Sequence, residues 1–128
     1  SRYTPQVVVV AIGQNDSHPE DIMETGIDNP KAENWMEHYA AFLLRLREIY
    51  PRAVIILTTT ILNHNANWDA AIDAVCRNLR DGSIHHFLYS NNGCGTPGHI
   101  RRPEAEKMAA ELSSFIESLG EEIWEDNL

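Results

Sequence analysis

Continuous apolar runs alternate with longer segments of helical periodicity along this chain. Residues 7–12 (VVVVAI) form an apolar run of the kind found in a strand that is buried on both faces of a parallel sheet. A second strand is predicted over residues 54–57, continuing into the threonines at 58–60. A third, shorter strand is predicted over residues 84–89.

Helices are predicted between these strands and after the last one. Asn29-Pro30 offers an N-cap with proline at the first helical position, and Pro51 stops the helix near residue 50. A second helix is expected over about 67–80, ended by Asp81-Gly82, and a third over 103–119, ended by Gly120. The first helix has an apolar face made of Trp35, Tyr39, Phe42, Leu43 and Leu46.

Alternating strands and helices predict parallel pairing, with right-handed crossovers and helices on both faces of the sheet. We therefore expect an α/β fold with about three parallel strands and three main helices, within one domain at most. Such a sheet is thin, so the strand at 7–12 is expected to leave an edge unpaired, which invites association.

Charge and composition narrow the choice of partners. The formal net charge of −9 argues against nucleic acid or an anionic membrane, and it is compatible with a neutral substrate such as an acetylated sugar. No apolar run reaches the roughly 18 residues that a membrane span requires, and no signal segment opens the chain. Cys76 and Cys94 can form one disulfide, but two cysteines in this length equally suit a reduced cytosolic protein.

Candidate chemistry follows the first strand and precedes the last helix. Gly13-Gln14-Asn15-Asp16 comes directly after the apolar run, where open α/β sheets place their ligands. The Asn15 amide can donate to a developing oxyanion, Gly13 permits the sharp turn, and His99 can act as a general base. The alternatives are a turn asparagine and a solvated histidine. Two parts of an acyl-transfer site are thus visible, and the serine nucleophile is not.

These segments resemble two conserved blocks of the SGNH (GDSL-type) hydrolases. Residues 13–16 are similar to the third block, and the loop that holds His99 is similar to the last. Residues 94–100 and 103–109 resemble, more narrowly, carbohydrate esterase family 2, acetyl esterases that act on plant-wall polysaccharides. The resemblance spans nearly the whole chain but only the second half of such a catalytic domain, since the Gly-Asp-Ser block and the oxyanion-hole glycine have no counterpart.

The resemblance implies a three-layer α/β/α flavodoxin-like fold, with residues 1–128 as the C-terminal portion of a single catalytic domain. It implies a serine esterase that removes O-acetyl groups from carbohydrates without a cofactor. His99 would be the base, Asn15 an oxyanion donor and Gly13 the turn support, with the serine outside this chain. The implied partners are an acetylated carbohydrate or other small ester, and the missing N-terminal half of the domain or another chain. The family alone implies a secreted location.

One position departs from the family pattern. Many SGNH enzymes carry an aspartate three residues before the histidine, and here that residue is Thr96, which cannot supply a negative charge. Some members of carbohydrate esterase family 2 use a Ser–His dyad in which a backbone carbonyl holds Nδ1–H, and we expect that arrangement here. A carboxylate from elsewhere, such as Asp69, is the less favoured orienting group.

Trp68 follows the second strand among several asparagines. An exposed tryptophan there can stack on a sugar ring and bind substrate, whereas a buried one would anchor the following helix, and the sequence leaves both open. Trp35 and Trp124 are predicted to pack.

The remaining polar motifs point to structural roles. His85 and His86 are neighbours on a strand and should face opposite sides of the sheet, so no metal site is predicted. Arg101 and Arg102 are expected to flank the last helix. Ser17 and Ser90 lack the nucleophile elbow that a serine hydrolase requires, as the sequences around them show.

Two other classes of function remain as alternatives. One is a non-catalytic carbohydrate-binding or interaction remnant of the same fold, which the missing nucleophile favours. The other is a flavodoxin-like nucleotide or receiver module, but the sequence shows neither a phosphate-cradling glycine loop nor an acidic cluster at a strand end.

Overall fold

The computed structural model describes residues 6–12, 20–59, 61–94 and 99–120 of the chain. Strands and helices alternate along it, as the hydrophobic pattern predicts. The elements are β1 (Val7–Ala11), α1 (Pro30–Ile49), β2 (Val54–Thr58), α2 (Ala66–Leu79), β3 (Ile84–His86) and α3 (Arg102–Ser118).

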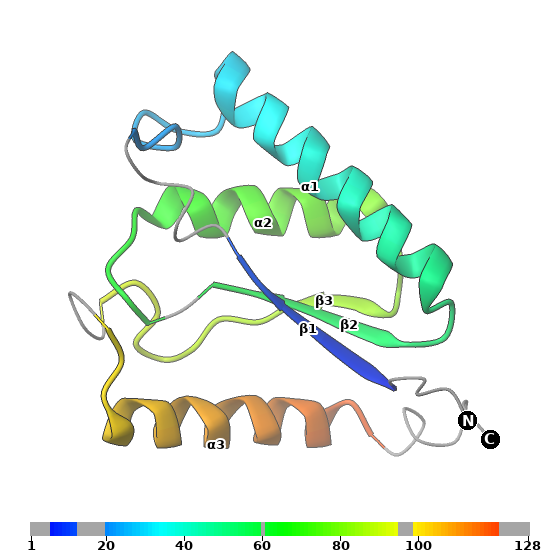
Figure 1. The fold of residues 1–128 in the computed structure, drawn as a ribbon, viewed down its shortest axis with the longest axis vertical. Coiled ribbons are helices and arrows are strands. Elements are labelled where there is room, and N and C mark those ends of the chain that lie inside the picture. Colours follow the sequence, from blue (N-terminus) through cyan, green and yellow to red (C-terminus); the bar gives the residue numbers. More distant parts are fainter. Residues whose placement is uncertain (1–5, 13–19, 60, 95–98, 121–128) are drawn as a thin grey trace.

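The three strands form one parallel sheet in the order β1-β2-β3. Helices α1 and α2 cover one face of this sheet and α3 lies along the other, so the predicted three-layer α/β/α arrangement is confirmed (Figure 1). β3 is shorter than the predicted 84–89. Its pairing with β2 ends at His86. The Phe87 N–H still donates to the Leu57 carbonyl, at 2.8 Å, and the chain then leaves β2.

The main core lies between the sheet and the layer formed by α1 and α2. Alternate residues of a strand face opposite sides of a sheet, so each strand gives this core every second side chain. Burying an aliphatic or aromatic side chain of this size stabilises the fold by about 1.5–3 kcal/mol. The buried residues of this core are Val10, Tyr39, Leu43, Ile55, Leu57, Ile72, Val75 and Ile84.

Asn29 begins α1, as the sequence predicts. Its side-chain oxygen accepts a hydrogen bond from Ala32 N–H at 2.9 Å. Its amide nitrogen donates to the carbonyls of Ile22 and Gly26, at 3.3 and 3.0 Å. The cap residue therefore also ties the segment before the helix to the helix itself.

One residue of the predicted apolar face of α1 does not join the core. Phe42 is 49% exposed, because the buried side chains Ala32, Tyr39 and Leu43 centre the packed face away from it. It lies at the margin of that face and stacks on Tyr39, with ring centroids 6.5 Å apart.

β1 is an edge strand, and it is not buried on both faces as its composition predicts. Val8 and Val10 face the core under α1 and α2, whereas Val9, on the opposite face, is 40% exposed. On that side α3 packs through Phe115 against Phe87, with ring centroids 4.7 Å apart, and against His85. The described residues therefore leave the β1 part of this face uncovered.

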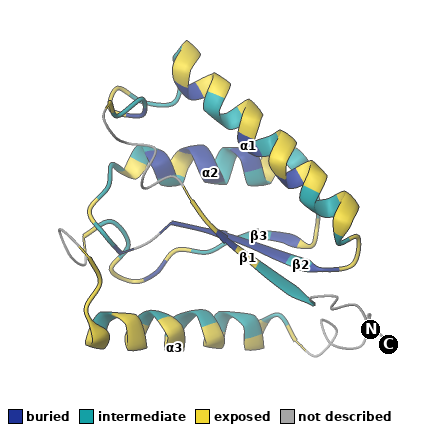
Figure 2. Cartoon of the chain, in the orientation of Figure 1, coloured by how far each residue is buried: buried dark blue, intermediate teal, exposed yellow. Residues whose placement is uncertain are grey.

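The two faces of the sheet are unequally protected. β2 is buried along most of its length, whereas no residue of α3 is buried (Figure 2). Among the described helices, none combines the length and the apolar character that crossing a membrane demands.

The cap at Asn29 provides a test of the packing at the start of α1. We expect Asn29→Ala to lower the free energy of unfolding by about 1–2 kcal/mol, because the Ala32 N–H and two carbonyls lose their partner. Asn34→Ala, at an exposed position of the same helix, should change it by less than about 0.5 kcal/mol. Urea unfolding followed by circular dichroism measures both, and equal midpoints for the two variants would contradict the assigned role.

Candidate active site

The carboxyl ends of the three strands meet at one edge of the sheet, because the strands are parallel (Figure 1). The described segments that follow β2 and β3 lie there, and α3 also starts at this edge. Open α/β sheets bind their ligands at this edge. Gly13 and Asn15, the predicted turn and oxyanion donor, lie outside the described residues, as do Ser17 and Thr96.

His99, the predicted base, lies three residues before α3 and is exposed. Its imidazole forms no hydrogen bond or ion pair with another described residue. An accessible imidazole is chemically able to accept and return a proton.

A polar network behind this edge was not predicted from the sequence. His64 Nε2 lies 2.9 Å from Asp69 Oδ2, and the Thr59 hydroxyl lies 2.6 Å from Asp69 Oδ1. The side chain of Asn92 lies 2.9 Å from the Thr59 hydroxyl and 3.3 Å from His64 Nε2. The network therefore joins the segment after β2, the first turn of α2 and the segment after β3.

Burial and hydrogen bonding shift both ionisable groups of this network. The hydrogen bond to Asp69 raises the pKa of His64 above its usual value, against the opposing effect of burial. Burial alone would raise the pKa of Asp69. The hydrogen bonds from His64, Thr59 and Asn92 outweigh it, so this pKa lies below its usual value. Both shifts favour the charged pair.

His64 is unsuited to be the catalytic base, although it lies at the right edge of the sheet. Its side chain is 1% exposed, and its second nitrogen, Nδ1, lies 2.7 Å from the Leu62 carbonyl. Both nitrogens are therefore occupied and shielded from a substrate. Asp69 is likewise engaged through both carboxylate oxygens, so it is not free to orient His99.

Trp68 is buried, which corrects the prediction that it binds substrate from an exposed position. Its relative exposure is 0%, and its indole N–H donates to Asp21 Oδ1 at 3.0 Å. Its ring packs edge-on against Trp35, with centroids 5.1 Å apart. The packing role that the sequence left open is therefore the one observed, and Trp35 packs as predicted.

The other candidate residues have structural partners. His85 contacts Phe115 of α3 and His86 contacts Asp73 of α2, so the two imidazoles face opposite sides as predicted. Ser90 donates its hydroxyl to Glu111 Oε1 at 2.7 Å, and its N–H donates to Oε2 of the same carboxylate. These contacts fasten the segment after β3 to α3.

Arg101 directly precedes α3 and Arg102 is its first residue, and each pairs with a glutamate of the first turns of the helix. Cys76 and Cys94 are both free thiols, so no disulfide links α2 to the segment after β3. Within the described part of the chain, no cluster of His, Cys, Asp and Glu side chains is placed to hold a metal ion.

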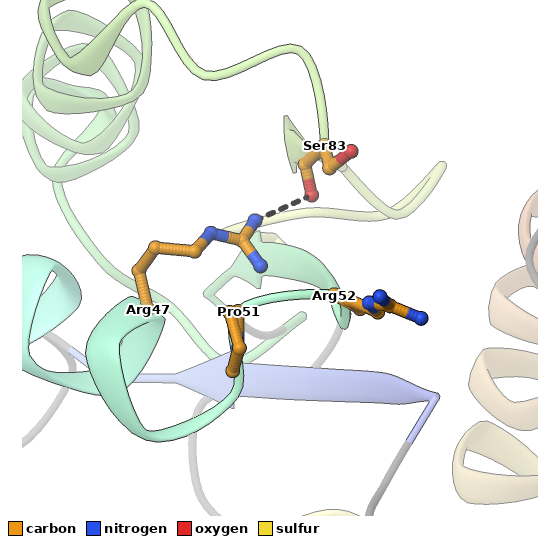
Figure 3. Close-up of a pocket in the computed structure, with 4 residues that line it drawn as sticks. All are labelled: Arg47, Pro51, Arg52 and Ser83. Carbon is orange, nitrogen blue, oxygen red and sulfur yellow. Dashed lines mark hydrogen bonds between the residues drawn. The ribbon is translucent and has the colours of Figure 1, made fainter. Parts of the chain in front are cut away.

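A hollow of about 340 Å³ lies at the opposite, amino-terminal edge of the sheet and is lined by Arg47, Pro51, Arg52 and Ser83 (Figure 3). The Arg47 guanidinium is used within the chain. It donates to Asp81 at 2.9 Å and to the carbonyls of Tyr50 and Ala53, at 3.0 and 2.6 Å. This hollow is therefore a structural junction, away from the edge where the strand ends converge.

One solved structure resembles the chain. The structure of a family two carbohydrate esterase from Cellvibrio japonicus matches it with a TM-score of 0.72 and 25% sequence identity, over 94% of this chain and 34% of the esterase chain. The chain thus spans about a third of the length of that esterase. No protein-family model matches the sequence, and no curated protein does. The resemblance and the fold class predicted from the sequence are confirmed.

The His64–Asp69 pair predicts how stability depends on pH. The stabilisation from His64 is complete below its unfolded pKa of 6.5 and is lost as the pH rises through the raised pKa of the folded state. The stabilisation from Asp69 is complete above its unfolded pKa of 3.8 and is lost as the pH falls through the lowered pKa of the folded state. We expect the pair to contribute fully between these two pH values.

Asp69→Asn should lower the free energy of unfolding by about 3 kcal/mol in this window, because it leaves a buried imidazolium without its counter-charge. The variant should also lack the loss of stability that deprotonation of His64 causes at higher pH. Asp73→Asn, one turn later on α2 at a half-exposed position, is the matched control and should keep that decline. Urea midpoints measured across pH test this, and two variants that behave alike would contradict it.

Proposed function

We propose that this chain is the C-terminal portion of a single SGNH-type catalytic domain, most like carbohydrate esterase family 2, that removes O-acetyl groups from carbohydrates. The likeness in fold to a family two carbohydrate esterase carries the proposal. The exposed imidazole of His99, which no other described residue engages, supports it.

In the proposed reaction, a serine outside these residues attacks the acetyl carbonyl carbon while His99 accepts its hydroxyl proton. The side-chain amide of Asn15 donates to the oxyanion that forms, and Gly13 permits the turn that presents it. The intermediate collapses by breaking the bond to the sugar oxygen, which takes the proton from His99. Water then hydrolyses the acetyl-enzyme to acetate, again with His99 as base, and no cofactor takes part.

A Ser–His dyad is better supported than a full triad. Thr96 stands where an aspartate is usual, and the carboxylate of Asp69, the other candidate, is already bonded to His64 and Thr59. A backbone carbonyl that accepts from Nδ1–H is therefore the proposed orienting group.

The state of β1 supports the view that the domain needs a further part. This apolar strand lies at the sheet edge, and Val9 is exposed on the face that α3 leaves uncovered. Additional strands from an N-terminal portion would pair with the free edge of β1, and an additional helix would cover Val9. This portion can be covalently joined or a separate chain. A substrate outside the cell, such as a plant-wall polysaccharide, makes an extracellular location part of the proposal.

A non-catalytic carbohydrate-binding role is less well supported. Trp68, the aromatic side chain proposed to stack on a sugar, is fully buried. Binding without turnover would thus require a different aromatic surface.

The test is hydrolysis of 4-nitrophenyl acetate by the purified chain and by the chain extended with the segment encoded before Ser1. We expect the extended protein to turn over the ester, and His99→Ala to lower its kcat by about 10³-fold or more, because the base is lost. The 128-residue chain alone should show no His99-dependent turnover. His38→Ala, at an exposed position of α1, is the control.

Two outcomes would overturn parts of the proposal. His99-dependent turnover by the 128-residue chain alone would place the nucleophile within it. An extended protein that folds and contains the serine block, but hydrolyses neither this ester nor acetylated xylan, would exclude the esterase function.

A further inference from the structure

The imidazole of His64 is bonded to an acceptor on each side. Nδ1 lies 2.7 Å from the Leu62 carbonyl oxygen, and Nε2 lies 2.9 Å from a carboxylate oxygen of Asp69. A carbonyl and an ionised carboxylate only accept hydrogen bonds, so a ring that is protonated on both nitrogens satisfies both contacts. The raised pKa of His64 and the lowered pKa of Asp69, which follow from the hydrogen bond between them, favour this imidazolium–carboxylate pair.

The other hydrogen bonds of Asp69 also favour the charged pair. Thr59 has one hydroxyl proton, and at 2.6 Å Asp69 Oδ1 is its nearest acceptor. The two oxygens of the Asp69 carboxylate are thus bonded to the Thr59 hydroxyl and to the His64 ring, and the Asn92 amide also hydrogen-bonds to this carboxylate.

The segment after β3 closes directly onto this imidazolium. Gly93 has a φ of +74°, and a Cβ added there would lie 3.4 Å from Cε1 and Nε2 of the His64 ring. Asn92 and Cys94 are held in turns by backbone bonds to Tyr89 and Asn91. A residue with a side chain is strained at position 93 by the positive φ, and its Cβ would lie in van der Waals contact with the ring.

We propose that the buried His64–Asp69 ion pair is the positioning device that fixes residues 87–94, which follow β3, and that the placement of the base His99 depends on it. Its role in catalysis rests on the proposed function, whereas the fixing of this segment does not. Asp69, from α2, is the charged group that faces the ring among the described residues, and Thr59, Leu62, Asn92 and Gly93 complete its surroundings. His64 acts through this segment and does not touch substrate.

The charge state is tested by nitrogen-15 NMR of the imidazole groups in the 128-residue chain. We expect both ring nitrogens of His64 to be protonated at neutral pH, with the signals assigned by their loss in His64→Gln. A nitrogen of His64 that carries no proton at neutral pH would overturn the assignment of a fixed imidazolium.

The positioning role is tested by amide hydrogen exchange in His64→Gln beside His38→Gln, which alters an exposed histidine of α1. We expect exchange at residues 90–94 to speed up about tenfold or more in His64→Gln and to stay unchanged in the control. Asn92→Ala is the second variant, in case His64→Gln does not fold. It should speed exchange in the same residues while the His64 signals remain. Unchanged exchange in the folded variants would overturn the positioning role.

Kinetics of the extended protein separate this inference from the proposed function. If both hold, His64→Gln lowers kcat and leaves KM within about twofold, since the base is misplaced but substrate contacts remain. If His99→Ala does not affect turnover while exchange at residues 90–94 responds to His64→Gln, the proposed function fails and the positioning of the segment stands. If exchange does not respond, the positioning role fails whatever the esterase result.

Discussion

The position of β2 between β1 and β3 is the constraint on which the described structure depends. β2 is paired on both edges and buried on both faces, from Ile55 to Thr58. Parallel pairing on each side forces both connections to cross back over the sheet, which explains the placement of α1 and α2. It also brings the three strand ends to one edge, so the chemistry of that edge follows from backbone hydrogen bonding in the centre of the molecule.

The polar network begins where this central strand ends. Thr59 follows β2 immediately and is itself buried, so its hydroxyl is as firmly placed as the strand. From there the hydrogen bonds pass to Asp69, His64 and Asn92, and they connect segments that the sheet does not pair. A fully satisfied buried network of this kind contributes less to net stability than to a single, well-defined arrangement of the loops.

The regular elements were predictable because their signals are local. The apolar run before residue 12, Asn29 with Pro30, and the alternation that separates His85 from His86 each depend on neighbours in the chain. Phe42 and Val9 were predicted to be buried and are not, because burial depends on what covers a face, and the periodicity carries no information about coverage.

The misses at the candidate site have a different physical origin. Trp68 is buried because Asp21 and Trp35, both far away in the sequence, surround it. Thr59 and Asn92 meet across 33 residues, and no spacing rule links them. Two polar residues that follow adjacent strands were the only sequence signal for this contact. Asn15 and His99 stay predictions that come from the family resemblance and from their position in the chain.

Helix α3 packs on the sheet through few contacts, and this affects its local stability. Its described contacts to the rest of the molecule include the stacking of Phe115 and the link from Glu111 to Ser90, and none of its residues is buried. The free energy needed to open a segment scales with the surface and hydrogen bonds that it loses, so we expect α3 to open at a lower free energy than the sheet, α1 and α2. The helix that follows His99 should then exchange its amide hydrogens faster than the layer on the other face of the sheet.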